Sequence, residues 1–167
     1  MAYLSSLAPF SDNLKELTIH IKDKGWKSLD LNLKKFTSKI VKYVLEHEKK
    51  DIYEISISFV NDAAIQQLNF KYRGNDKPTN VLSFIYNVRP LYGDIILAYN
   101  TILRESQEQR KNFQDHLTHL MIHGALHLLG YDHETEKEAL IMEDLEKRLL
   151  NYFNISNPYD GEETTSV

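Results

Sequence analysis

Alternating hydrophobic and polar residues predict several short β-strands in the first two thirds of the chain. The clearest alternation is YEISISFV, in which Ile55, Ile57 and Phe59 share one face of an extended backbone. LKELTIHIK alternates in the same way, and the runs NVLSFIY and DIILAY are typical of a β-hairpin joined by NVRPLYG. The pattern therefore predicts about four strands, at residues 14–22, 53–60, 80–86 and 94–99.

Hydrophobic residues spaced three and four positions apart predict the helices. In residues 31–47, Leu33, Phe36, Ile40 and Val44 recur at helical spacing with lysines between them, which is typical of an amphipathic helix. Capping residues and the same spacing predict further helices over residues 63–72, 100–109 and 113–129, and one that carries Ile141, Leu145 and Leu149. The helix over residues 113–129 has little polar surface, so we expect it to be buried at the centre of the fold.

These elements favour an α+β fold in a single domain that spans residues 1–167. Helices and strands alternate in the first half of the chain, and helices dominate the second half. We therefore expect a mixed sheet of about four strands with about five helices packed on it. The C-terminal tail from about residue 156, which includes NPYDGEETTSV, is predicted to be disordered.

Composition and charge narrow the chemistry. The chain has no cysteine, which excludes disulfides and thiolate metal sites, so a metal ion would need imidazole or carboxylate ligands. It has neither a secretory signal pattern nor an apolar run of about 18 residues, so we expect a cytoplasmic protein without membrane contact. The net charge of −4 argues weakly against nucleic acid binding. Segment 71–89, however, carries four basic residues and one acidic residue, which predicts a locally basic surface unless these charges are merely solvated.

HGALHLLGYDH, residues 123–133, is the densest cluster of candidate metal ligands. His123 and His127 are four residues apart, so on a helix they lie one above the other on the same face. Gly130 stands where a helix C-terminus adopts a left-handed backbone, and the resulting turn can bring His133 back toward the other two. Three imidazoles with a fourth position open to water are typical of a catalytic rather than a structural zinc site. Chance clustering of three histidines is the alternative.

His116 and His119 precede this cluster on the same predicted helix. His119 shares a face with His123 and His127, but about 12 Å of helix axis separates residues 119 and 127, too far for one ion with bonds of about 2 Å. We therefore expect His119 to contact a ligand histidine from behind, or to line the cleft and shuttle a proton as a catalytic residue. A hydrogen-bonded or partly exposed histidine is the alternative for both.

The histidine and glycine spacing equals that of the zinc peptidase pattern H-E-x-x-H-x-x-G-x-x-H. Gly124 occupies the position of the glutamate that serves those enzymes as general base. Peptide hydrolysis is therefore disfavoured, although a zinc peptidase that lacks this glutamate stays open as an alternative. A phosphodiester fits better, because a metal ion and cationic side chains neutralise phosphate oxygens directly.

Two long blocks resemble the signatures of the YbeY family of bacterial endoribonucleases, the rRNA maturation factors. HGALHLLGYDH resembles one signature, and LNFKYRGNDKPTNVLSF, residues 68–84, resembles the other. Tyr-Gly-Asp-Ile at residues 92–95 is similar to the start of a strand in that family, and the order of elements agrees across roughly residues 14–155. Ile85 stands where the family often has proline, and the 85–92 connection has a sequence of its own.

The resemblance implies a single-strand-specific, metal-dependent endoribonuclease that acts in rRNA processing, notably at the 3′ end of small-subunit rRNA, and in ribosome quality control. It implies one zinc ion per chain on His123, His127 and His133, although imidazole ligands alone do not distinguish zinc from nickel or cobalt. Its implied partners are single-stranded RNA, rRNA and the small ribosomal subunit, with one of the subunit's proteins suggested as well; DNA is not expected. The nucleophile stays open between metal-bound hydroxide and an RNA 2′-OH. A ribosome-associated assembly factor with a mainly structural metal is a further alternative.

Basic residues in and after the second block are candidates for substrate contacts. The resemblance places a catalytic or RNA-binding arginine at Arg73, whose planar, permanently charged guanidinium suits bidentate contact with a phosphate. Lys71, Lys77 and Arg89 are predicted to extend an electrostatic track along the RNA backbone. Surface ion pairs and solvated charge are the alternatives for these four residues. Asp94, at the start of its strand, is expected either to orient a ligand histidine or to cap the strand.

Overall fold

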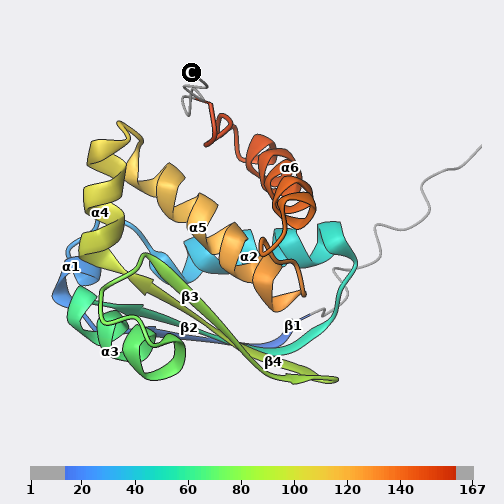
Figure 1. Ribbon diagram of the computed structural model, residues 1–167, viewed down its shortest axis with the longest axis horizontal. Helices are drawn as coiled ribbons and strands as arrows, with labels where there is room; N and C mark the ends of the chain where they lie inside the picture. Colours follow the sequence, from blue (N-terminus) through green and yellow to red (C-terminus); the bar gives the residue numbers. More distant parts are fainter. Residues whose placement is uncertain (1–13, 161–167) are drawn as a thin grey trace, which may run out of the picture.

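The computed structural model describes residues 14–160, in which four strands form one mixed sheet (Figure 1). The strands are β1 (Leu14–Ile21), β2 (Ile52–Val60), β3 (Val81–Val88) and β4 (Leu91–Ala98), in the order β1-β2-β4-β3. β1, β2 and β4 run parallel, whereas β3 pairs antiparallel with β4 at one edge. The β3–β4 connection is mostly strand rather than loop, with only Arg89 and Pro90 in the turn. The predicted α+β fold and mixed sheet are confirmed.

Six helices occur within residues 14–160, one more than the predicted five. They are α1 (Lys24–Lys27), α2 (Leu33–Glu48), α3 (Asp62–Arg73), α4 (Tyr99–Glu108), α5 (Phe113–Leu128) and α6 (Glu136–Tyr152). The additional helix, α1, is a single turn, too short to show a helical period in the sequence. Figure 1 shows α2, α5 and α6 on one side of the sheet and α3 on the other. Within the described range, each helix is either too short or too polar to span a bilayer.

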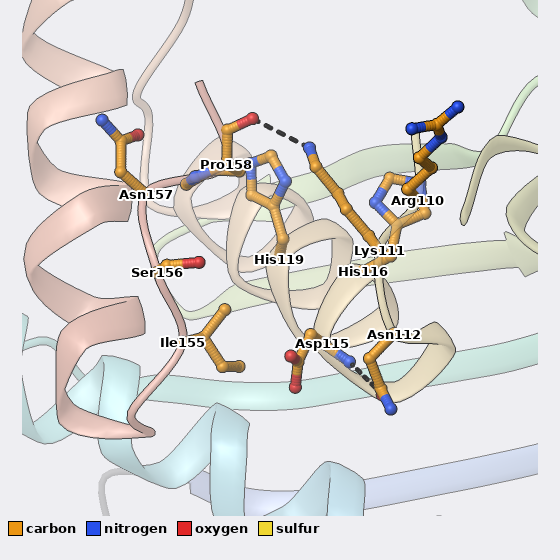
Figure 2. Close-up of a pocket in the computed structure, with 10 residues that line it drawn as sticks. All are labelled: Arg110, Lys111, Asn112, Asp115, His116, His119, Ile155, Ser156, Asn157 and Pro158. Carbon is orange, nitrogen blue, oxygen red and sulfur yellow. Dashed lines mark hydrogen bonds between the residues drawn. The ribbon is translucent and has the colours of Figure 1, made fainter. Parts of the chain in front are cut away.

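The segment that follows α6 folds back onto α5. Lys111 Nζ donates a hydrogen bond of 2.8 Å to the Pro158 carbonyl oxygen, and Ile155, Ser156 and Asn157 lie beside the same helix (Figure 2). Residues 156–160, which the sequence assigns to a disordered tail, are described here in contact with the rest of the fold. The contacts that fix them come from distant parts of the chain, which a local pattern does not reveal. The rest of the predicted tail lies outside the described residues.

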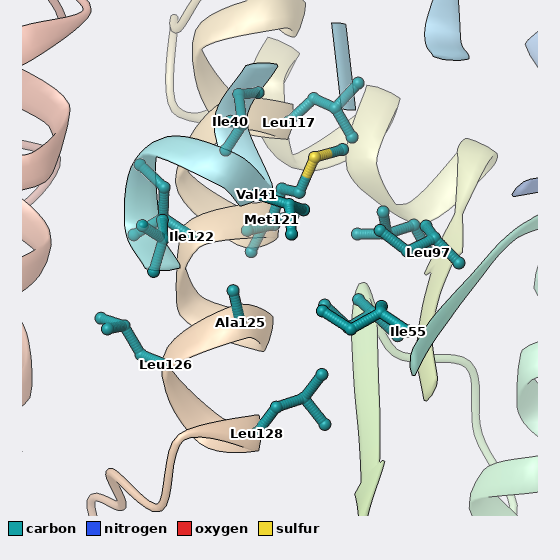
Figure 3. Close-up of a cluster of buried hydrophobic side chains, with 14 of the residues drawn as sticks. Ile40, Val41, Ile55, Leu97, Leu117, Met121, Ile122, Ala125, Leu126 and Leu128 are labelled. Atoms are coloured by element: carbon teal, nitrogen blue, oxygen red, sulfur yellow. The ribbon is translucent and has the colours of Figure 1, made fainter. Parts of the chain in front are cut away.

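Helix α5 is the central helix of the fold, as its apolar sequence predicts. Its side chains fill the space between the sheet and α2 (Figure 3), where Met121 and Ile122 are fully buried near Ile40 and Val41. Burying each large apolar side chain contributes roughly 1.5–3 kcal/mol to stability, so α5 is held firmly against the sheet. The buried apolar residues of α5 are Leu117, Leu120, Met121, Ile122, Ala125, Leu126 and Leu128.

Gly124 allows α5 to approach the sheet closely. A Cβ atom at this position would lie 3.0 Å from Ile95 Cγ2 and 3.2 Å from Ser83 Oγ, which is tighter than most Cβ contacts. Ser83 Oγ also donates a hydrogen bond of 3.1 Å to the Gly124 carbonyl oxygen. The position that holds glutamate in the peptidase pattern therefore faces the sheet here, with no room for a larger side chain.

Candidate metal centre

The C-terminal end of α5 presents two histidines, and a tight turn returns a third. His123 and His127 lie about one helical turn apart on the same side of α5. The helix ends in a Schellman motif, in which the backbone N–H groups of Gly130 and Tyr131 donate to carbonyls of the last turn at 3.0 and 3.1 Å. Gly130 has a φ of +97°, a left-handed conformation that other residues rarely adopt. The chain reverses at this glycine and brings His133 beside the other two rings, as predicted.

The three imidazoles converge on one point. One ring nitrogen from each of His123, His127 and His133 lies within 4.8 Å of the other two. The Nε2 atoms of His123 and His127 are 3.1 Å apart. Two nitrogens bound to one tetrahedral zinc ion at about 2.0–2.1 Å would be about 3.4 Å apart, so the spacing suits a shared divalent ion. The donor set therefore fits the ion that the sequence predicts.

The surroundings of His127 favour its neutral form, which is the form that binds a metal ion. Burial, followed by the charges of His123 and His133, lowers the pKa of His127 to about 4. A neutral imidazole keeps the lone pair that a metal ion requires. His123 and His127 are half-buried and His133 is exposed, so solvent reaches the centre from the His133 side.

A buried carboxylate behind the site is the main feature that sequence reasoning missed. Glu146 of α6 is 0% exposed, and its Oε1 accepts a hydrogen bond of 2.5 Å from His123 Nδ1. Its Oε2 accepts from His119 Nε2 at 2.9 Å and from the Tyr159 hydroxyl. Burial alone would raise the pKa of Glu146, but the hydrogen bonds from His119 and His123 outweigh it and lower the pKa to about 2. One signal was available in the sequence, because Glu146 interrupts the apolar stripe of α6 between Met142 and Leu149.

Asp94 is not the carboxylate that orients a ligand histidine. It follows Gly93, where a Cβ atom would meet Leu128 of α5 at 2.6 Å, so Asp94 points to the opposite face of the sheet. There its Oδ2 accepts a hydrogen bond of 2.7 Å from the Tyr86 hydroxyl. The carboxylate that bonds His123 is that of Glu146 instead.

A cleft of about 520 Å³ opens beside the three histidines. Its walls come from the end of α3, the loop that leads into β3, β3 itself and α4. Arg73 and Lys77, both predicted substrate contacts, line this cleft, whereas Asn80, Arg104 and Glu105 line it without having been predicted. The Arg73 guanidinium is exposed, and its Nη2 donates only a long hydrogen bond of 3.5 Å to a β3 carbonyl. It is therefore accessible to a substrate in the cleft.

The other two predicted RNA contacts lie outside this cleft. Lys71 Nζ lies 5.0 Å from the centre of the Tyr72 ring on the exposed side of α3. Arg89 lies in the turn of the β3–β4 hairpin. The sequence places all four basic residues within 19 positions, but the fold brings only Arg73 and Lys77 to the histidines.

His116 and His119 line a second, smaller cavity of about 190 Å³, together with residues of the segment that follows α6 (Figure 2). His116 Nε2 donates to Glu105 Oε2 at 2.7 Å, and His119 Nε2 donates to Glu146. The Nδ1 atom of each ring is buried with no hydrogen-bond partner among the described residues. His119 does not line the metal cleft, so its position argues against direct proton transfer to a substrate there. Of the two roles considered for His119, contact behind a ligand histidine fits the structure.

Comparison with known proteins identifies the family. A model of the family described as Endoribonuclease YbeY matches residues 18–154. The chain belongs to the YbeY family. Endoribonuclease YbeY of Rhizobium etli is 43% identical over 162 residues, which cover 89% of this chain and 95% of the relative. The corresponding protein of Bartonella henselae is 40% identical over 152 residues, covering 86% and 96%. The solution structure of TM1509 from Thermotoga maritima matches with a TM-score of 0.53 and 27% identity, and covers 89% of this chain and 98% of that one.

The predicted resemblance to YbeY proteins is therefore confirmed. The matched region contains the three converging histidines, together with Arg73 and Glu146. It ends before Tyr159, the hydroxyl donor to Glu146. YbeY proteins are named as endoribonucleases, so RNA is the substrate class of the family.

Proposed function

We propose that this protein is a metal-dependent endoribonuclease that cleaves single-stranded RNA in rRNA processing, notably in maturation of the small-subunit rRNA 3′ end, and in ribosome quality control. One observation carries the proposal: three imidazole nitrogens within 4.8 Å of one another border a cleft that Arg73 and Lys77 also line. Membership of the YbeY family supports the reaction. The cleft volume is within the range of about 300–1,000 Å³ that is usual for ligand sites.

His123, His127 and His133 would hold the metal ion, for which we propose zinc. When bound, a divalent ion supplies Lewis-acid stabilisation of a phosphate and lowers the pKa of water. The chain's own contribution would be to fix two ligands at the end of α5 and the third on the turn after Gly130. Glu146 is bonded to Nδ1 of His123 and lies behind the ring, whereas Glu105 lines the cleft.

Arg73 is the proposed catalytic cation. Its guanidinium is planar and permanently charged, so it can contact two oxygens of the scissile phosphate and stabilise charge that develops there. Lys77 and Arg104 line the same cleft and are placed to neutralise neighbouring phosphates. Lys71 and Arg89 lie outside the cleft, so we propose that they contact only RNA that extends beyond it.

The proposed setting is the cytoplasm, with rRNA, the small ribosomal subunit and one of its proteins as partners. The assembly-factor alternative requires a mainly structural metal. One observation disfavours it: His133, one of the three proposed ligands, is exposed rather than buried. A peptidase is also disfavoured, because the position of the missing glutamate is packed against the sheet at Gly124.

The test is cleavage of a single-stranded RNA oligonucleotide by the metal-loaded protein, with the matching duplex as a second substrate. We expect the wild type to cut only the single strand, His123→Ala to be inactive and Arg73→Ala to lose about 10²–10³-fold in rate, as for other lost oxyanion donors. Arg148→Ala is the matched control, because Arg148 is an exposed arginine of α6 paired with Asp144. Equal cleavage by wild type, His123→Ala and Arg73→Ala would reject the proposed site.

A further inference from the structure

We propose that Tyr159 is a positioning residue of the metal centre: through Glu146 it orients His123, so the C-terminal segment is part of the site. The inference rests on the proposed metal site and names a residue beyond the region that the family model matches. It starts from a contact between three distant parts of the chain. The Tyr159 hydroxyl, Glu146 of α6 and two histidines of α5 form one hydrogen-bonded cluster.

Glu146 needs every donor in this cluster. Its carboxylate is fully buried, and a buried carboxylate without hydrogen bonds is strongly unfavourable. Oε1 is occupied by His123 Nδ1, and Oε2 is shared by His119 Nε2 and the Tyr159 hydroxyl. Removing the hydroxyl leaves Oε2 with a single protein donor, which loosens the carboxylate on the side opposite His123.

The carboxylate decides which nitrogen of His123 is available to a metal ion. With its proton on Nδ1 and donated to Glu146, the ring must keep its lone pair on Nε2. That Nε2 is the atom 3.1 Å from His127 Nε2, at the candidate metal position. The alternative tautomer would place an N–H bond there and would leave Glu146 facing a lone pair. Glu146 therefore fixes both the tautomer and the direction of this ligand.

Tyr159 is itself held firmly against α5. Its backbone N–H donates a hydrogen bond of 3.0 Å to Asn157 Oδ1, and Pro158 accepts one from Lys111 Nζ. The Tyr159 ring meets the His119 ring edge to face, with 5.6 Å between ring centres and an angle of 85°. Neither Tyr159 nor Glu146 lines the metal cleft, so both act through His123 rather than on the substrate.

The experiment compares Tyr159→Phe with Tyr152→Phe, which removes a hydroxyl from an exposed tyrosine of α6 that stacks on Tyr43. Co²⁺ is the metal probe, and its dissociation constant is measured by competition with a chromophoric chelator. We expect Tyr159→Phe to weaken Co²⁺ binding by about tenfold, the lower end of the effects seen for residues that orient a ligand from behind. Tyr152→Phe should bind as the wild type does. Thermal unfolding of each variant establishes that the fold is intact.

A second measurement reads the tautomer of His123 directly, in metal-free protein labelled with ¹⁵N. Long-range ¹H–¹⁵N spectra should show the proton on Nδ1 in the wild type and a mixed population in Tyr159→Phe. This measurement distinguishes the role of Tyr159 from the proposed function. A wild type that does not cleave RNA would contradict the proposed function, but it would leave the tautomer of His123 as the test of Tyr159. An unchanged tautomer together with unchanged Co²⁺ affinity in Tyr159→Phe would overturn the inference.

Discussion

The two ends of α5 carry the same residue type in opposite chemical settings. Toward the N-terminal end, His116 and His119 each direct Nε2 at a carboxylate and bury Nδ1. Toward the C-terminal end, His123 and His127 direct their Nε2 atoms at each other, 3.1 Å apart, beside the open cleft. Only the second pair has a third histidine within reach, because the chain reverses after the helix.

The two groups differ in which ring nitrogen the carboxylate bonds, and we infer that this nitrogen, rather than the presence of a carboxylate, separates a proposed metal ligand from a structural histidine. Glu146 contacts both groups: it occupies Nε2 of His119 and Nδ1 of His123. In His119 it bonds Nε2. In His123 it bonds Nδ1, which leaves Nε2 directed at His127 Nε2 beside the cleft. One carboxylate thus bonds different ring nitrogens of two histidines about one turn apart, which under the proposed function gives them opposite roles.

The largest effect is expected from His127→Ala. Changes to residues that only orient a ligand reduce metal affinity by up to about 100-fold. Loss of a ligand itself should reduce the affinity by more than that. RNA cleavage should fall to background, whereas the metal-free protein should unfold at nearly the same urea concentration as the wild type. Isothermal titration with Zn²⁺ and urea unfolding measure the two quantities. Retained Zn²⁺ binding in a folded His127→Ala protein would contradict the account that the metal is bound at the C-terminal end of α5 and not at its N-terminal end.

His116→Ala should produce the reverse result. His116 is 4% exposed and donates to Glu105, so its removal leaves a cavity and a carboxylate with fewer donors. We expect the free energy of unfolding to fall by about 2 kcal/mol, as for other hydrogen bonds to a charged group, with Zn²⁺ affinity unchanged. Urea unfolding and Zn²⁺ titration are again the measurements, with His20→Ala as the control because His20 is exposed on β1. If His116→Ala lost as much Zn²⁺ affinity as His127→Ala, the contrast between structural and metal-binding histidines would be wrong.

A smaller effect concerns pH. Burial raises the pKa of Glu105, but hydrogen bonds from His116 and Asn80 outweigh it, and the pKa of Glu105 is lowered overall. A carboxylate with a lowered pKa in the folded state adds stability above its unfolded pKa of about 4.3 and loses it as pH falls through the folded value. Glu105→Gln should therefore be less stable than the wild type at pH 7, by a margin that shrinks in acid. Urea unfolding between pH 7 and pH 3 measures the margin, and a constant difference would contradict this account.

The sequence was sufficient for the features that depend on local pattern. Alternation predicted the strands, and the spacing of His123, His127, Gly130 and His133 predicted the converging ligands, since helix period and glycine geometry act over a few residues. Features that depend on tertiary contacts were missed or misplaced. Glu146 is 23 residues from His123 in the sequence, and only the packing of α6 against α5 brings the two side chains together.

Charge pattern was the weakest guide for the same reason. Four basic residues that are close in sequence suggested one continuous RNA-binding surface. In the fold, Lys71 lies on α3 and Arg89 lies in the β3–β4 turn, and neither lines the cleft. Tyr159 was assigned to a disordered tail because it lies near the C-terminus, whereas in the structure its hydroxyl bonds a buried carboxylate and its backbone N–H bonds Asn157. In both cases the missing information was which surfaces the fold brings together.

The most direct test of the central claim is the metal content of protein purified without a histidine tag, measured by elemental analysis beside that of His133→Ala. His133 is the decisive position because the turn after Gly130, rather than α5 itself, delivers it to the site. We predict close to one transition-metal ion per chain in the wild type and in His20→Ala, and a large loss in His133→Ala. Equal metal content in the wild type and His133→Ala would contradict a centre built from these three histidines.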